Sequence, residues 1–378
     1  MVRAWGDRPF LAFGLAGLAA SFAVSLLSAS ALGLSPLAQL VISLSGVSAF
    51  VVLALVTKAI TGVESLTYYH HEIAIFVVVG AVAAVWPVLG HLDASALGVG
   101  SFLVLGRMGC LLAGCCHGRP ASVGIVYRGR PPGLPPYLVG RRLVPVQGIE
   151  SAAALALVIA GALSLDPDRQ GAAAALYVAG YGLVRPVLEE LRGDWRRPRW
   201  RCLSEAQWTS IALVLVAGVA DVAGLLPHGP VRWAPVLLVA ELVLLHELRR
   251  RRLRTLLDSD HVRELVRACE RAAAGPAVPP TVLRTSQGVR LSASIERGRR
   301  SVSLSRTPAP LRPDDAALLA PVVAELCLHR EHIDVVAGAA GVFHVLAAPC
   351  ARPVADDTAP IPPGSSRFGS AENAGGFR

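Results

Sequence analysis

Two arginines lie within apolar runs of the sequence, where a charged side chain needs a polar partner. Arg107 lies about ten residues into the run that begins at Leu97, and an arginine at the centre of a membrane-spanning helix costs about 2.5–3.5 kcal/mol. Arg185 lies near the end of another run, one helical turn after Tyr181 and one turn before Glu189, so these three side chains share a helix face. Both arginines are therefore expected to face a polar cavity or an anion.

The phosphate of a phospholipid is an anion that suits two such arginines. A guanidinium group stays charged and donates paired hydrogen bonds that match phosphate oxygens. The alternative is a structural ion pair between Arg185 and Glu189 near the membrane interface, which leaves Arg107 unexplained. Glycines near Arg107 would let a headgroup approach the backbone; they are Gly106, Gly109, Gly114 and Gly118.

The segment that contains Arg107, "GRMGCLLAGCCHGR", also holds Cys110, Cys115, Cys116 and His117. Adjacent cysteines, and a spacing of five, do not match the usual pairs of zinc ligands. We therefore expect no metal site and no cofactor. A covalent thiol relay stays open if neighbouring arginines such as Arg119 lower the pKa of a thiol. The remaining interpretation is that the cysteines are small buried apolar residues.

The composition is typical of a protein with several membrane-spanning helices. Of the 378 residues, 53% are hydrophobic and 17% are charged, and the mean hydropathy is +0.52, whereas soluble domains are more polar. The first apolar run follows Arg3 and Arg8 but is too long for the core of a signal peptide, so we expect an uncleaved helix. Eight runs are candidate spans: Phe10–Leu32, Leu37–Ile60, Ile73–Val88, Leu97–Ala113, Gly148–Leu165, Gly171–Leu188, Trp208–Leu226 and Val231–Leu248.

The net charge of +9 does not indicate a nucleic-acid partner. The arginines concentrate in the links between apolar runs, where they meet anionic lipid headgroups. If all eight runs cross, the positive-inside tendency places the arginine-rich links 119–146 and 190–206, and the region after residue 248, in the cytoplasm. The seven cysteines lack regular spacing and predict no disulfide framework.

The predicted fold class is an all-α polytopic membrane protein with seven or eight transmembrane helices and a small C-terminal soluble α+β domain. We expect a transmembrane domain at residues 1–248, the α+β domain at 249–351 and a disordered tail at 352–378. Apolar and polar residues alternate around the turn signals Gln287-Gly288 and Arg297-Gly298, which predicts two or three short antiparallel strands, and further strands are expected in "HIDVVAGAAGVFHVLAA" (332–348).

Two helices are also expected in this domain. One follows Arg249, and its apolar face consists of Leu256, Val262, Leu265, Val266 and Cys269. The second covers Asp314–His329, with acidic residues in its first turn. His329, His332 and His344 are scattered and are assigned no chemistry.

Four stretches, in order, resemble the bacterial prolipoprotein diacylglyceryl transferase family over about residues 10–227. "GRMGCLLAGCCHGR" resembles the family's G-R-x-G-N-F-x-N-G-x-x-x-G signature, with Cys110 at the asparagine position. "VPVQGIE" (144–150) is similar to H-P-S-Q-L-Y-E, and "YGLVRPVLEELR" (181–192) to Y-G-x-x-R-x-x-x-E-x-x-R. "LSEAQWTS" (203–210) resembles L-S-x-G-Q-x-L-S.

The resemblance implies transfer of the sn-1,2-diacylglyceryl group from phosphatidylglycerol to the lipobox cysteine thiol of a preprolipoprotein, with release of glycerol phosphate. The implied partners are phosphatidylglycerol, preprolipoprotein signal peptides and membrane lipid, and the implied location is the bacterial cytoplasmic membrane.

The resemblance also implies roles for particular residues. Arg107, Arg185 and Tyr181 match candidate catalytic positions, and the nearest counterpart of the family's His-Gly-Gly-Leu segment is "TYYHHEIA", so His70 and His71 are candidate bases. The remaining matches are candidate substrate-binding residues: Gly106, Gly109, Cys110, Gly114, Gly118, Gln147, Glu150 and Glu189.

The family has seven spans with its signature loops facing outward, and nothing in it corresponds to the eighth run or to the soluble domain. The family and the arginine count therefore place the active face on opposite sides, unless Val231–Leu248 lies in the membrane interface. Two other functions stay open. One is a paralogue that uses the same phospholipid pocket with another acceptor, and the other is a non-catalytic lipid-binding or sensory membrane protein.

Overall fold

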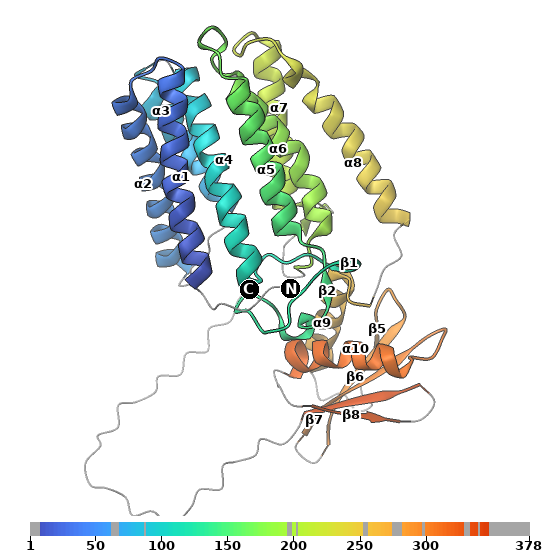
Figure 1. Ribbon diagram of the computed structural model, residues 1–378. Helices are drawn as coiled ribbons and strands as arrows, with labels where there is room; N and C mark the ends of the chain where they lie inside the picture. Colours follow the sequence, from blue (N-terminus) through green and yellow to red (C-terminus); the bar gives the residue numbers. More distant parts are fainter. Residues whose placement is uncertain are drawn as a thin grey trace, which may run out of the picture.

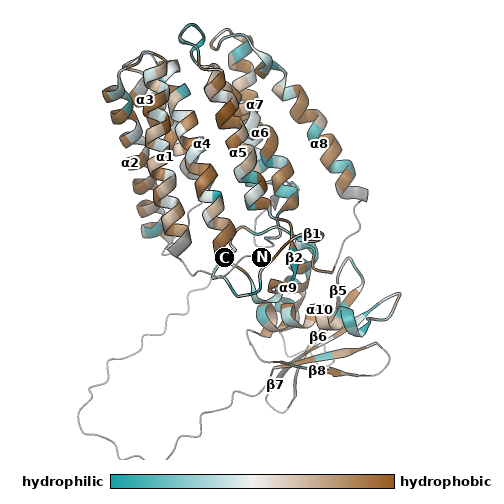
Figure 2. Cartoon of the chain, in the orientation of Figure 1, coloured by the Kyte–Doolittle hydropathy of each residue, from teal (hydrophilic) through white to brown (hydrophobic). Residues whose placement is uncertain are grey.

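The computed structural model describes residues 8–61, 68–86, 88–194, 199–201, 203–251, 256–273, 282–296, 299–328, 333–338 and 341–347. These residues form a bundle of long helices with a small sheet-containing domain at one end (Figure 1). Hydrophobic residues prevail along the bundle, and hydrophilic residues gather at its ends and in the C-terminal domain (Figure 2).

Every predicted apolar run overlaps a helix. Five helices (α1, α2, α4, α5 and α7) are long and apolar enough to cross a membrane, and α3 has a shorter apolar segment, Ile73–Val82. The mostly helical membrane fold is thus supported, and the count of seven or eight spans stays a prediction. The bounds are α1 Arg8–Ala31, α2 Pro36–Thr61, α3 Tyr68–Ala83, α4 Val88–Ala113, α5 Val146–Leu163, α6 Ala172–Leu191, α7 Glu205–Val222 and α8 Ala234–Arg251.

The predicted start of the fourth helix was wrong. α4 begins at Val88 and not at Leu97, and α3 ends at Ala83. Arg107 therefore lies in about the last two turns of a long helix instead of near the middle of a short one. This position places its guanidinium group close to one end of the bundle.

Buried polar residues in the first turns of α4 explain this error, because each has a partner that the sequence does not reveal. The Asp93 carboxylate accepts hydrogen bonds from the backbone N–H groups of Gly171 and Ala174, at 2.6 and 2.7 Å. It thereby caps the N-terminus of α6. His91 Nδ1 lies 2.8 Å from Gln39 Oε1 of α2. Because of these contacts, α4 can include buried polar residues in its first turns.

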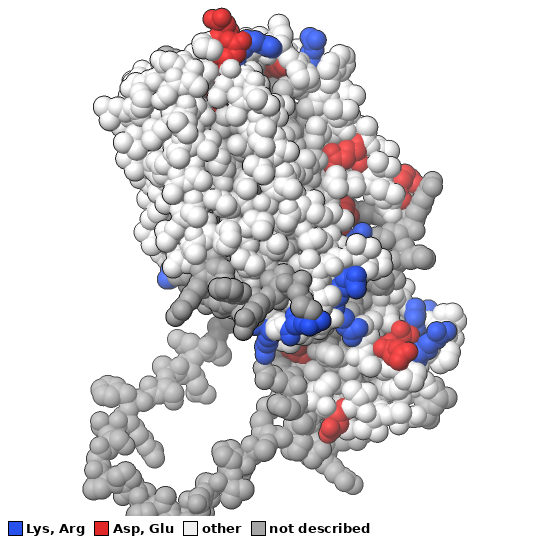
Figure 3. Space-filling view, viewed as in Figure 1, with Lys and Arg blue, Asp and Glu red and all other residues white. Residues whose placement is uncertain are grey.

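The segment between α4 and α5, residues 114–145, covers one end of the bundle, and we call it the cap loop. Its strand β1 (Pro120–Val126) pairs antiparallel with β2 (Arg142–Leu143), and a 3₁₀ turn, η1, covers Pro136–Leu138. Lys and Arg side chains gather around this end, whereas the flank of the bundle is largely uncharged (Figure 3). Shorter elements complete the bundle: η2 (Pro167–Arg169), β3 (Arg199–Trp200), β4 (Leu203–Ser204) and η3 (Pro230–Trp233).

The C-terminal domain is an antiparallel sheet of strand order β5-β6-β7-β9-β8 with helices packed on it. β6 and β7 pair from Val289↔Arg306 to Glu296↔Arg299, and the core includes Leu265 of α9. A sheet-containing C-terminal region is therefore confirmed. The bounds are α9 Ser259–Ala273, β5 Leu283–Arg284, β6 Val289–Glu296, β7 Arg299–Arg306, α10 Pro313–Val323, the π-helical turn η4 Ala324–Leu328, β8 Ile333–Ala337 and β9 Phe343–Ala347.

Several details of this domain differ from the prediction. Leu256 is buried in the core but lies in a turn before α9, not on its face. The predicted helix over Asp314–His329 becomes α-helical to Val323 and then π-helical. A disulfide between Cys269 and Cys327 joins α9 to η4, which irregular cysteine spacing did not suggest. His344 Nδ1 lies 2.8 Å from Ser303 Oγ on β7. His329, His332 and the tail 352–378 lie outside the described residues.

The C-terminal domain packs on the cap loop. Leu257, Val262 and Val322 of the domain share one apolar cluster with five cap-loop residues, Tyr127, Leu134, Tyr137, Leu138 and Leu143. α8 runs beside α6 and α7 toward the same end of the bundle (Figure 1). The domain and the cap loop therefore lie at the same end of the bundle.

Candidate functional site

Arg107, Glu150 and Tyr181 meet inside the bundle at the end covered by the cap loop. Arg107 Nε lies 2.9 Å from Glu150 Oε2, and the Tyr181 hydroxyl donates a hydrogen bond to Glu150 Oε1 at 2.6 Å. All three side chains are buried. Because an unpaired charge is costly in such surroundings, this carboxylate ties α4, α5 and α6 together.

Two further buried arginines, Arg185 and Arg192, belong to the same group. Together with Arg107 they act electrostatically on the Glu150 carboxylate. Arg185 Nη2 lies 2.9 Å from Glu189 Oε2, so the ion pair weighed as the alternative role of Arg185 is present. We call these six residues the arginine cluster: Arg107, Glu150, Tyr181, Arg185, Glu189 and Arg192.

The ion pairs of the arginine cluster do not use every guanidinium N–H donor. Arg185 Nη1 and Arg192 Nε and Nη1 are buried and have no hydrogen-bond acceptor within the described part of the chain. A buried donor without an acceptor costs about 1–3 kcal/mol. The cluster also contains three guanidinium groups and two carboxylates, so positive charge is in excess. These features are typical of a site for an anion with several oxygens, such as a phosphate ester.

The face of α6 that carries the cluster is set by helical spacing. Tyr177, Tyr181, Arg185 and Glu189 follow one another at intervals of four residues, and all four are buried. The rings of Tyr177 and Tyr181 stack with centroids 6.1 Å apart. This stacking orients the Tyr181 hydroxyl toward Glu150.

Arg192 follows the last residue of α6 and is held by the cap loop. Gly118 forms an isolated antiparallel bridge with Arg192. The backbone N–H of Gly193 donates to the His117 carbonyl at 3.0 Å, and that of Arg119 donates to the Leu191 carbonyl at 2.9 Å. The end of the signature segment and the end of α6 are thus joined by backbone hydrogen bonds.

Packing within the chain accounts for three of the four predicted glycines. A Cβ on Gly118 would collide with the Val144 carbonyl, and one on Gly109 would lie 3.0 Å from the Phe13 Cβ of α1. Gly114 has φ +73° and ends α4. Of these four glycines, only Gly106 has room for an added Cβ, which would meet nothing within 4 Å among the described atoms.

The cysteines of the signature segment come together beside the arginine cluster. The Sγ atoms of Cys110, Cys115 and Cys116 all lie within 4.8 Å of one another. Gln147 Nε2 donates to the Cys115 carbonyl at 2.7 Å, so this predicted binding residue supports the backbone of the cysteines. Thiol hydrogen bonds from Cys110 and Cys115 hold the pKa of the Cys116 thiol well below its usual range. Burial lowers the pKa of His117, which favours its neutral form.

The structure brings five of the predicted site residues into the arginine cluster, and the functional roles assigned to them stay predictions. Arg107, Tyr181, Arg185, Glu150 and Glu189 lie in the cluster. The candidate bases His70 and His71 fall in the first turn of α3, but their side chains lie outside the described residues.

Arg192 was not among the predicted site residues, although it ends the quoted stretch that starts at Tyr181. Its spacing of three from Glu189 and seven from Arg185 repeats the helical face and could have signalled it. The position of Arg192 just beyond α6 makes the cap loop part of the site.

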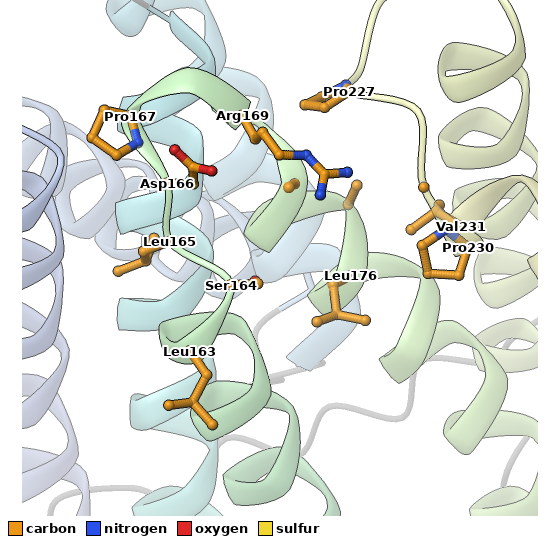
Figure 4. Close-up of a pocket in the computed structure, with 13 residues that line it drawn as sticks. Leu163, Ser164, Leu165, Asp166, Pro167, Arg169, Leu176, Pro227, Pro230 and Val231 are labelled. Carbon is orange, nitrogen blue, oxygen red and sulfur yellow. The ribbon is translucent and has the colours of Figure 1, made fainter.

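A separate surface cavity lies at the opposite end of the bundle. Its volume is about 450 Å³, and it lies between the α5–α6 and α7–α8 connections (Figure 4). Asp166 and Arg169 line it, but Arg169 Nη2 already donates to the His228 carbonyl at 2.9 Å. Because its polar residues are exposed or half-buried and it lies away from the buried charges, we do not assign the chemistry to this cavity.

The family match covers the part of the chain that holds the arginine cluster. Residues 66–222 match the model of the family described as prolipoprotein diacylglyceryl transferase. Over 136 residues the chain is 32% identical to the phosphatidylglycerol--prolipoprotein diacylglyceryl transferase of Clostridium tetani (strain Massachusetts / E88), covering 35% of this chain and 52% of that relative. No solved structure matches the chain.

The chain spans about half the length of the curated relative it matches. The resemblance seen in the sequence is thereby confirmed for residues 66–222. This range includes Arg107, Glu150, Tyr181, Arg185 and Arg192, and it ends before α8 and the C-terminal domain begin.

Proposed function

We propose, from the match of residues 66–222 to the prolipoprotein diacylglyceryl transferases and from the arginine cluster, that this chain is a membrane transferase. It transfers the sn-1,2-diacylglyceryl group of phosphatidylglycerol to the lipobox cysteine thiol of a preprolipoprotein, in the bacterial cytoplasmic membrane. The observation that carries this proposal is the set of buried guanidinium donors on Arg185 and Arg192 that have no acceptor among the described residues.

The reaction requires the kind of site that these arginines form. The acceptor sulfur forms a bond to the glyceryl carbon while the bond from that carbon to the phosphate oxygen breaks. The electron pair leaves with glycerol phosphate, so negative charge grows on the phosphate. Guanidinium groups fixed before the reaction stabilise such a change most strongly where water is excluded. Arg185 and Arg192 have free donors for it, and Glu150 keeps Arg107 in place.

The position of the cluster suits a lipid substrate. It lies at the end of α4, the start of α5 and the end of α6, next to basic residues that attract anionic headgroups (Figure 3). Large apolar side chains are exposed on the flank of the bundle, for example Leu155 and Ile159 on α5. A phospholipid could therefore place its phosphate at the cluster and keep its acyl chains along the bundle.

Complementation with product analysis tests the proposal. In cells depleted of their own transferase, the chain should restore diacylglyceryl-modified lipoprotein, detected by mass spectrometry. Arg107→Ala and Arg185→Ala should each abolish this modification, with membrane levels of the variants checked by immunoblot. Unchanged modification in both variants would refute the assignment of the site.

A paralogue that uses another acceptor is the second candidate, and one observation favours it. The family's asparagine position is Cys110, which lies in the group of three thiols beside the cluster. Binding of phosphatidylglycerol without transfer to a lipobox peptide would support this candidate. Loss of lipid binding in Arg185→Ala would show that the same cluster is used.

A further inference from the structure

The three thiols beside the arginine cluster are close enough to share one ligand. Three sulfur ligands bound to Zn²⁺ at about 2.3 Å lie about 3.8 Å apart in a tetrahedral site. The Sγ atoms of Cys110, Cys115 and Cys116 already lie within 4.8 Å of one another. We propose that these cysteines bind a thiophilic divalent cation of the Zn²⁺ class, and that the fourth coordination position accepts the thiol that becomes lipidated.

The structure brings the cysteines together although their sequence spacing does not match the usual pairs of zinc ligands. Cys110 lies in the last turn of α4, and Gly114 (φ +73°) and Cys116 (φ +54°) both have left-handed backbones. These two residues turn the chain back so that Cys115 and Cys116 return to the end of the helix. A left-handed conformation is unfavourable for a cysteine, and such strain persists where the surrounding structure enforces it.

Neighbouring elements hold the segment that carries the three thiols in place. Gln147 of α5 donates to the Cys115 carbonyl at 2.7 Å. A Cβ on Gly133 would lie 2.6 Å from the Cys115 Cβ, so the cap loop packs closely over this residue. Support from α5 and from the cap loop is what a preorganised ligand set requires.

The charge around the thiols also fits an anionic complex. Three thiolates and one divalent cation carry a net charge of −1. Arg107 and Arg192 both act electrostatically on Cys116. Positive charge therefore lies where the complex needs compensation, and the same two arginines link the thiols to the arginine cluster.

The role in thiol activation rests on the proposed transferase function. On binding at the fourth position, the acceptor thiol releases its proton to water and becomes a bound thiolate. Its sulfur then forms the C–S bond to the glyceryl carbon, and the electron pair of the broken C–O bond leaves with glycerol phosphate. A covalent relay through Cys116 is chemically unfavourable, because the group would be held as a thioether, and a second thiolate does not readily displace a thioether sulfur.

Metal binding is tested on the purified full-length protein in detergent, stripped with chelator and then titrated with Zn²⁺ or Co²⁺. We expect about one tightly bound ion per chain and, with Co²⁺, the sulfur-to-metal charge-transfer absorption of a thiolate site. Cys110→Ser, Cys115→Ser and Cys116→Ser should each weaken binding more than about tenfold. Cys350→Ser, a change outside the described residues and far from the cluster in sequence, is the control and should bind like the original chain.

Protection of the thiols in the unmodified chain guards against variants that fail to fold. Bound Zn²⁺ should slow alkylation of Cys110, Cys115 and Cys116, measured by peptide mass spectrometry, and should leave Cys350 unaffected. Equal alkylation with and without Zn²⁺, or a disulfide between two of the three cysteines in the freshly purified protein, would overturn the metal site.

The fourth position is tested without relying on turnover. Adding a lipobox peptide to the Co²⁺ form should intensify the charge-transfer band, and a peptide with serine in place of the acceptor cysteine should not. No change with either peptide would overturn the acceptor role. Transfer that persists in metal-free protein would overturn the inference and leave the proposed function intact. Metal and peptide binding without transfer would support the inference and refute the proposed function.

Discussion

At the scale of single residues, Glu150 determines which cation of the arginine cluster has an ion-pair partner on α5. Its carboxylate forms an ion pair with Arg107 of α4 and accepts a hydrogen bond from the Tyr181 hydroxyl of α6. Arg185 forms its ion pair with Glu189 instead. Arg192 differs from these two arginines, because its Nε and Nη1 are buried and have no hydrogen-bond acceptor among the described residues. Arg192 is therefore the cation that we expect to bind the phosphate most directly.

This assignment predicts a large effect of Arg192→Gln on transfer. Loss of a buried charge-assisted donor that acts in the transition state should lower the rate about 10²–10³-fold. Initial rates with phosphatidylglycerol and a lipobox peptide measure the effect. Arg128→Gln, which removes an exposed arginine of the cap loop, is the control and should keep the original rate. An Arg192→Gln rate within about twofold of this control would contradict the role.

At the scale of elements, the contact between the cap loop and the end of α6 positions Arg192. Gly118 lies at this contact, where its bridge to Arg192 and its approach to Val144 leave no room for a side chain. The same residue matches a position of the family signature. Its glycine is thus explained by close packing of the backbone.

Gly118→Ala should therefore impair the site without removing any functional group. The new Cβ would overlap the Val144 carbonyl, so the loop must shift and carry Arg192 with it. We expect lower transfer and faster proteolysis of the cap loop. Gly14→Ala in α1, where an added Cβ meets nothing within 4 Å, should leave both unchanged. Normal transfer by Gly118→Ala would show that the bridge does not position Arg192.

A buried histidine makes the stability of the C-terminal domain depend on pH. His261 of α9 is buried, with Nδ1 2.8 Å from the Leu256 carbonyl and Nε2 2.9 Å from Thr285 Oγ1. Burial lowers its pKa, although Glu264 and Asp258 act in the opposite direction. The unfolded chain then binds the proton more tightly than the folded one. The folded domain is therefore stable above the ordinary histidine pKa of about 6.5 and loses stability as the pH falls below it.

Calorimetry of the full-length protein in detergent should detect this dependence. The unfolding midpoint of the C-terminal domain should be lower at about pH 5.5 than at about pH 7.5. His261→Gln cannot titrate and should reduce the difference. If the variant keeps the full difference, titration of His261 is not its cause.

The sequence predicted local elements more successfully than contacts between elements. Helices and strands were found where hydrophobic periodicity is local, and the arginines were found because charge in an apolar run is conspicuous. The start of α4 was missed because Asp93 and His91 depend on partners in α6 and α2. The Cys269–Cys327 disulfide was missed for the same reason, since long-range contacts leave no local spacing pattern. The thiols of Cys110, Cys115 and Cys116 meet through a local turn with left-handed residues at Gly114 and Cys116, which the cysteine spacing alone does not show.

At the scale of the whole molecule, packing of the C-terminal domain on the cap loop bears on the topology. α8 packs along α6 and α7, toward the end of the bundle that the cap loop covers (Figure 1). We therefore expect the domain and the site to lie on one side of the membrane. Disulfides persist in oxidising compartments, so the Cys269–Cys327 disulfide favours the extracytoplasmic side. The abundance of arginine near this end then reflects binding of lipid phosphate more than the positive-inside tendency.

Cysteine labelling at the two ends of the molecule tests this orientation. Asp314, in the first turn of α10, and Asp168, in η2 at the far end of the bundle, are both exposed. A membrane-impermeant maleimide added to intact spheroplasts should label Asp314→Cys, whereas Asp168→Cys should react only after permeabilisation, with labelled peptides identified by mass spectrometry. The reverse pattern would place the site in the cytoplasm. Phosphatidylglycerol could still reach it there, but preprolipoproteins that are modified on the outer face could not, so the acceptor would have to be a different thiol.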